Sequence, residues 1–167
     1  MELLIVVALI VVVAGIALPM LLRAKQSGNQ ASAVGSLRAI VSAQFTYQGA
    51  CDSGYFAPSL TALGRAPAGG VPFISPDLGV ADLVTKSNYV VTLGSTSGGS
   101  PLSPASCNGQ AAGTGTTGYW ATATPTLNAG AYAYGTNGAG VIYKADQQTA
   151  VAMTDSTAPA GATVIDR

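Results

Sequence analysis

The distribution of apolar residues divides the chain into two very different parts. Residues 3–22 read LLIVVALIVVVAGIALPMLL, a run of twenty positions without a charged or polar side chain. As an α-helix this run spans about 30 Å, which is the hydrocarbon thickness of a bilayer. Exposing its fifteen large aliphatic and Met side chains to water costs about 20–45 kcal/mol as an upper bound. We therefore expect the run to lie in lipid or against protein.

Beyond this run the pattern becomes amphipathic, with large apolar residues at spacings of three and four. These positions are Val34, Leu37, Val41 and Phe45, with Ile40 alongside. No Pro or polar cluster interrupts the pattern before Gly49. The sequence thus predicts one helical domain over residues 1–48, about 70 Å long, whose first half is a spine and whose second half packs on a head.

Residues 49–167 form the predicted globular head. Residues 50–80 are a Pro-rich connector with a short helix over 59–63, and residues 94–118 form a long Gly/Ser/Thr-rich surface loop. Strand-like stretches lie at residues 88–93, 119–124, 131–134 and 140–143, and the tail offers an edge strand at 163–165. Residues 136–140 form a predicted hairpin turn between the strands at 131–134 and 140–143, in which Asn137-Gly138 supplies the positive φ. The expected fold class is α+β, a long N-terminal helical spine packed against a small antiparallel meander of three or four strands.

Composition excludes several classes of function. Only 8% of the residues are charged, the formal net charge is zero and no basic run occurs, so we expect no nucleic-acid binding. The absence of His removes the commonest general base and metal ligand, and with it any Ser/His/Asp triad, Cys/His pair or c-type haem attachment. There is also no GxxxxGK[ST] phosphate loop. We expect no enzymatic activity and no cofactor.

The N-terminal run does not fit a cleaved signal peptide, because only Met1 and Glu2 precede it and no small-residue cleavage site follows. As a plain anchor, its flanking Arg23 and Lys25 would hold the head in the cytoplasm. Two Cys in a charge-poor body fit an oxidising compartment better. This conflict disappears if a basic leader once preceded Met1.

The stretch from Glu2 through the aliphatic run, with Pro19 seventeen residues beyond the glutamate, resembles the N-terminal segment of type IV pilins and type II secretion pseudopilins. In that family a prepilin peptidase removes a short basic leader and the new first residue is methylated. The chain departs from the pattern in beginning about three residues late, which leaves its mature N-terminal residue inferred, and in having Val11 where the family often has Gly.

The resemblance implies a major pilin, stored in the inner membrane and polymerised by the pilus assembly machinery into an extracellular, homo-oligomeric helical filament. Alternatives are the major pseudopilin of a periplasmic type II secretion pseudopilus, a minor or tip pilin, and a membrane-anchored binding module.

By the same resemblance, Glu2 pairs with the N-terminal amine of a neighbouring subunit and sets its register. The alternative is that Glu2 reaches the headgroup level of the membrane. Further along the spine, Pro19 lacks an N–H and clashes with the carbonyl of Gly15, which costs about 3 kcal/mol, and the glycine adds about 1 kcal/mol. We therefore predict a kinked or locally unwound stretch over about residues 12–19 in the assembled filament, with a mild kink as the alternative.

Three further predictions concern the head. A disulfide between Cys51 and Cys107 ties the connector to the long loop, whereas two free buried thiols would be unusual outside the cytoplasm. The acidic residues near the C-terminus match the spacing of no Ca²⁺ loop, so we expect surface carboxylates and no metal site. Those residues are Asp146, Asp155 and Asp166. The Tyr and Trp residues of the head are most simply core and strand residues.

Overall fold

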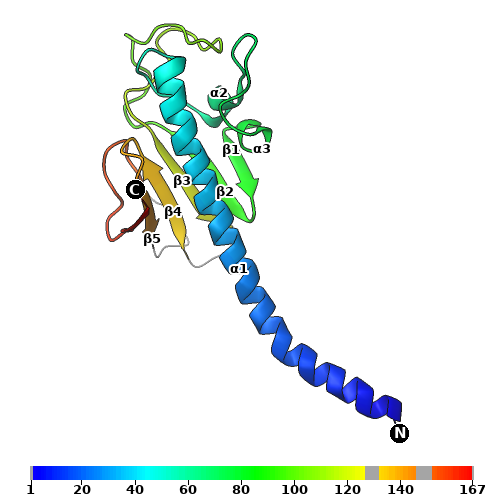
Figure 1. Ribbon diagram of the computed structural model, residues 1–167. Helices are drawn as coiled ribbons and strands as arrows, with labels where there is room; N and C mark the ends of the chain where they lie inside the picture. The colour runs from blue at the N-terminus through cyan, green and yellow to red at the C-terminus, as the bar shows by residue number, and fades with distance from the viewer. Residues whose placement is uncertain (1, 127–131, 146–151, 167) are drawn as a thin grey trace.

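α1 runs without interruption from Glu2 to Ala50. In the computed structural model, which describes residues 2–126, 132–145 and 152–166, its first half projects away from the head and its second half lies across one face of a sheet (Figure 1). Its 49 residues form a rod about 70 Å long. The predicted helix over residues 2–48 is therefore confirmed.

The head is an antiparallel meander covered by the second half of α1. The elements that follow α1 are α2 (Leu60–Gly64), α3 (Pro76–Gly79), β1 (Leu83–Lys86), β2 (Tyr89–Gly94), β3 (Trp120–Pro125), β4 (Ala133–Asn137), β5 (Ile142–Ala145) and β6 (Thr163–Asp166). Within the described ranges these six strands pair in sequence order, and every pair is antiparallel. α1 contacts β2, β3, β4 and β5. The predicted α+β fold is confirmed.

Each predicted strand is present, and its described ends lie within three residues of the predicted ones. Residue 131, where one predicted strand began, lies outside the described part. The expectation of three or four strands was too low. The tail strand β6 does join the sheet, and β1 was not predicted at all. β1 was missed because it is only four residues long, too short for a period-2 pattern to stand out.

The buried face of α1 is not the predicted stripe. Leu37 and Ile40 are fully buried as expected, but Val34 and Val41 are only half-buried and Phe45 is 45% exposed. The core face instead combines large side chains with small ones that let the helix approach the sheet closely. Its buried members are Ala33, Ser36, Leu37, Ile40, Ala43, Gln44 and Tyr47. The prediction considered only the large apolar residues of the helix, and it therefore included three positions at the side of the buried face and omitted the small and polar residues within it.

The second face of the sheet is covered by the tail that leads to β6. Met153 is buried against Gly135, where an added Cβ would lie 2.9 Å from the Met153 sulfur. Trp120 and Tyr143 pack around the same small cluster. The sheet therefore lies between α1 and this part of the tail, residues 152–162, which we name the tail strap.

The β4–β5 turn differs from the prediction in its geometry. Asn137 closes β4 and lies in the extended strand, and its carbonyl accepts from Gly140 N at 2.8 Å. Positive φ occurs at Gly140, at 73°, and not at Asn137 or Gly138. The connection between β4 and β5 is residues 138–141, and the prediction that Asn137-Gly138 supplies the positive φ was wrong, because Asn137 belongs to β4.

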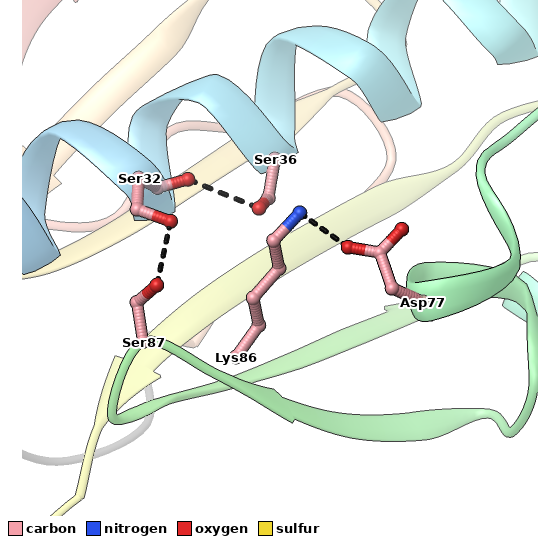
Figure 2. A network of polar contacts seen from close by, with 5 residues as sticks. All are labelled: Ser32, Ser36, Asp77, Lys86 and Ser87. Atoms are coloured by element: carbon pink, nitrogen blue, oxygen red, sulfur yellow. Dashed lines mark hydrogen bonds and ion pairs between the residues drawn. The ribbon is translucent and has the colours of Figure 1, made fainter.

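The β1–β2 hairpin contacts the spine near the point where α1 leaves the head (Figure 2). Its two central residues, Ser87 and Asn88, have φ of 49° and 61°, the left-handed pair that a type I′ turn requires. The Ser87 hydroxyl is 2.8 Å from that of Ser32 on α1. Beside them, Lys86 Nζ lies 2.6 Å from an Asp77 carboxylate oxygen, an ion pair that links β1 to α3.

Candidate assembly surface

The projecting half of α1 carries a continuous apolar surface. Within residues 3–22, fifteen large apolar side chains are exposed, from 50% at Val7 to 80% at Leu3. This described helix is long and apolar enough to cross a membrane, with a mean hydropathy of 3.1 in a window of which none is buried. The head offers it no cover. Lipid or another protein must therefore shelter it, because its exposure to water would cost more than the stability of a typical domain.

Glu2 is the first residue of α1 in the part of the chain that the structure describes. Its predicted pairing with the amine of a neighbouring subunit concerns an assembly, and it stays a prediction.

Gly15 and Pro19 both lie inside the uninterrupted α1. A Cβ added at Gly15 would meet nothing within 4 Å, so nothing in the subunit itself requires a glycine there. Figure 1 shows that the projecting half of the helix curves. In the isolated subunit the stretch over residues 12–19 is thus helical, and its unwinding in a filament remains a prediction.

The predicted disulfide between Cys51 and Cys107 is confirmed, and it closes 56 residues of chain immediately beyond the end of α1. Hydrogen bonds continue this attachment of the long loop. Cys107 N donates to Cys51 O at 3.0 Å. The side-chain amide of Asn108 donates to Ala62 O at 2.7 Å and to Arg65 O at 3.0 Å, where it satisfies carbonyls at the C-terminal end of α2. The loop is therefore fixed to the head at several points.

Gln44 joins the spine to the connector. Its side chain is fully buried; Oε1 accepts from Ala57 N at 2.8 Å and Nε2 donates to Ala57 O at 2.9 Å. Ala57 is itself 1% exposed, so both of its backbone groups depend on this one side chain. The buried Gln44 side chain thus provides the two hydrogen bonds that a neighbouring strand would provide to Ala57 in a sheet.

Asp52 is a buried carboxylate at the junction of spine and head. It is 1% exposed, and its Oδ1 has no hydrogen-bond partner. Desolvation by burial raises the pKa of Asp52. Chain packs closely around it, since a Cβ at Gly115 would lie 2.3 Å from Asp52 Oδ2. Position 115 therefore tolerates only glycine without rearrangement.

Asp155 attaches the tail strap to the loop after β2. Its carboxylate accepts from Thr96 N at 2.8 Å, from Ser97 N at 3.1 Å and from the hydroxyls of Ser95 and Ser97. Desolvation alone would raise the pKa of Asp155, but these hydrogen bonds outweigh it and lower the pKa. The carboxylate is therefore charged at neutral pH and fully occupied by internal donors.

Among the residues that the structure describes, no group of three or more His, Cys, Asp or Glu side chains could hold a metal ion. Asp146 lies outside those residues. Asp155 instead accepts hydrogen bonds from the backbone of Thr96 and Ser97 and from the hydroxyls of Ser95 and Ser97.

The tyrosines of the head serve the core. Burial raises the pKa of Tyr89 to about 12 and also raises that of Tyr119, so both phenols stay neutral at physiological pH. Tyr119 packs edge-on against Phe56, with ring centroids 5.0 Å apart. Tyr119 and Tyr134 are thus buried core residues, and the half-buried Trp120 and Tyr143 lie in β3 and β5, which confirms their interpretation as core and strand residues.

Several of these residues were not found from the sequence. Gln44 and Asp52 are polar residues in or beside an apolar pattern, and from the sequence such residues are expected to face solvent. The partners of Asp155 lie 58 to 60 residues away, beyond any local signal. Only Gln44 left a trace, because it lies four residues after Ile40 and three before Tyr47, on the same helical face.

Comparison with protein-family models, with curated proteins and with solved structures found no match to this chain.

Proposed function

We propose that this chain is the structural subunit of a type IV pilus-like filament. The observation that supports this most strongly is the apolar surface of fifteen exposed side chains on the half of α1 that projects from the head. Lipid shelters the rod before assembly, and the rods of other copies shelter it afterwards. A long apolar N-terminal helix joined to an antiparallel sheet is compatible with a pilin-like subunit.

The proposal includes the route of assembly. A prepilin peptidase removes the leader, the subunit waits in the inner membrane, and the assembly machinery adds it to a filament at the cell surface. Glu2 then pairs with the terminal amine of the neighbouring copy, which neutralises a carboxylate that costs about 2.5–3.5 kcal/mol at membrane depth. No cofactor takes part.

Electron cryomicroscopy of filaments sheared from cells is the direct test. We expect a helical core of α1 rods with the heads outside, and side-chain density that matches this sequence along the whole filament. Labelling only at filament ends would instead indicate a minor pilin, filaments confined to the periplasm a pseudopilus, and a monomer in the membrane an anchored binding module.

Two spine variants test the mechanism. A charge in the apolar run, Ile10→Asp, should abolish filaments, whereas the volume-conserving Ile10→Leu should preserve them. Glu2→Ala should leave the subunit in the membrane fraction but reduce filament yield. Normal filament yield from Glu2→Ala would refute the pairing role of Glu2 while leaving the filament itself intact.

A further inference from the structure

The chain contains two Asn-Gly pairs, Asn108-Gly109 in the long loop and Asn137-Gly138 where β4 ends. Asparagine before glycine is prone to spontaneous deamidation, because a glycine without a side chain leaves its backbone nitrogen free to attack the asparagine amide. The attack requires that the glycine N–H is released and that the side-chain amide can move. Asn108 is 4% exposed and Asn137 is fully buried, so the folded head shields both reactive pairs.

Asn108 is held by its own side chain. Its Nδ2 donates to two carbonyls at the C-terminal end of α2, and its Oδ1 accepts from the Ser106 hydroxyl at 2.7 Å. Gly109 N, the attacking atom, donates to Ser106 O at 3.1 Å. Loss of the amide nitrogen would break two hydrogen bonds in a loop that the disulfide also holds. Asn108 is therefore secured at both the attacking and the leaving nitrogen.

Asn137 lacks this hold on its leaving nitrogen. Its Oδ1 accepts from Ala139 N at 3.2 Å. Its Nδ2 is buried and, in the part of the chain that the structure describes, has no hydrogen-bond partner. A buried donor without a partner is disfavoured, and each one in a folded protein requires an explanation. Loss of this nitrogen would break no hydrogen bond and would remove the unpartnered donor.

The protection of Asn137 depends on the tail strap. Gly138 N donates to Asp155 O at 3.1 Å, so the attacking nitrogen is engaged only while the strap lies against the end of β4. The Asp155 carboxylate holds the strap there through its four hydrogen bonds to the loop after β2. An open cavity of about 430 Å³ borders Gly138, Ala139 and Asp155. Water therefore reaches this junction as soon as the strap lifts.

We propose that Asn137 is a latent deamidation site whose reaction is controlled by the tail strap. When the strap lifts, Gly138 N attacks Asn137 Cγ. The N–Cγ bond forms, the Cγ–Nδ2 bond breaks, and the amide nitrogen leaves as ammonia with the proton of the glycine N–H. Water then hydrolyses one C–N bond of the cyclic imide, which gives aspartate or isoaspartate.

The modification makes opening of the strap irreversible. Either product places a new carboxylate where Asn137 is fully buried, and a buried charge without a partner is strongly disfavoured. Isoaspartate also adds a methylene to the main chain and so displaces Gly138 N from Asp155 O. The strap of a modified copy therefore stays open and leaves the second face of the sheet uncovered. The modified fraction records how often the strap has opened.

Peptide mapping of the detergent-solubilised full chain by mass spectrometry, during incubation at mildly alkaline pH, measures both asparagines in one sample. Asp155→Ala removes the carboxylate that holds the strap and should raise the deamidation rate of Asn137 about 5- to 150-fold. Ser97→Ala removes a single hydroxyl donor and should raise this rate about two- to tenfold.

The matched control is Asp77→Ala, which removes a carboxylate that is paired with Lys86 on α3 and should not change the rate at Asn137. The rate at Asn108 should stay the same in every variant. An unchanged rate at Asn137 in both strap variants, or an equal rise at Asn108 in Ser97→Ala, would overturn the proposal. These measurements need no filament, so this inference and the proposed function can fail separately.

Trp120 reports on the strap directly, because it is the single tryptophan of the chain and packs in the cluster that the strap covers. Asn137→Asp imitates the aspartate product and should shift the Trp120 fluorescence to longer wavelength, since the strap no longer closes over the ring. Asn108→Asp makes the same change in the other Asn-Gly pair and should leave the emission unchanged. Identical emission from Asn137→Asp and the wild type would overturn the proposed irreversible opening.

Discussion

Replacement of Gln44 by Leu should destabilise the head strongly. The leucine fits the apolar surroundings but leaves Ala57 N and Ala57 O buried without partners. Each unsatisfied buried group costs about 1–3 kcal/mol, so we expect a loss of about 2–6 kcal/mol. Since a domain has about 5–15 kcal/mol of net stability, this is a large fraction of the total.

The chain supplies a matched control one turn further along the same helix. Gln48 also donates through Nε2 to a backbone carbonyl, Gly54 O, at 3.0 Å, but that hydrogen bond is exposed to solvent. Gln48→Leu makes the same chemical change where water can replace the lost donor, so it should cost less than about 1 kcal/mol.

Thermal and urea unfolding of the detergent-solubilised chain, followed by near-ultraviolet circular dichroism of the head aromatics, measures both variants. Gln44→Leu should lower the midpoint by about 4–24 °C, at about 2–4 °C per kcal/mol for a protein of this size. Equal midpoints for Gln44→Leu and Gln48→Leu would refute the view that this one side chain satisfies the connector backbone.

Four further outcomes follow from the same structure. Removal of the disulfide by Cys51→Ala with Cys107→Ala should cost about 4 kcal/mol in unfolding experiments, the chain-entropy value for a loop of 56 residues. Asp155→Asn should lower stability at pH 7 by about 1–3 kcal/mol. Because the folded pKa of Asp155 is depressed, the difference from wild type should shrink as the pH falls below about 4 and vanish only below the folded pKa in a pH titration. Asp52→Asn should stabilise the head at pH 7, because burial raises the pKa of Asp52 and the wild type loses stability as the pH rises through the folded pKa. Equal stability of the two proteins at pH 7 would contradict this. Pro19→Ala should reduce the extension of filaments under load in an optical trap, because the spine then stays helical.

The parts of the fold that could be predicted are those with a strong local signal. An apolar run of twenty residues admits few structures, and the amphipathic pattern beyond it continues without a helix breaker. The disulfide could be predicted because the chain has only two Cys, which allow a single pairing within it. Single positions were harder: Ala33 and Ala43 lie on the core face of α1, yet alanine carries too little apolar surface to distinguish a buried position from an exposed one.

The remaining features depend on contacts between distant segments. The Ser87-Asn88 turn adopts two positive φ values without a glycine, so its sequence gave little sign of the hairpin that defines β1. Asp155 looked like a surface carboxylate because its donors lie in a loop some 60 residues earlier. Such partners emerge only once the meander has placed the tail strap beside the loop that follows β2.

A disulfide and a buried hydrogen-bonded side chain lie at the junction between α1 and the head, where tension along the spine would be transmitted to the head. α1 ends at Ala50, the disulfide begins at Cys51, and Gln44 binds Ala57 from the last turns of the helix. In the proposed filament, tension along the rods reaches the head through this junction. To extract α1, the load would have to strip a core face of several turns while a covalent bond holds the adjoining chain. We therefore infer that the spine extends under load, over residues 12–19, before the head unfolds, because its glycine and proline weaken the helix there.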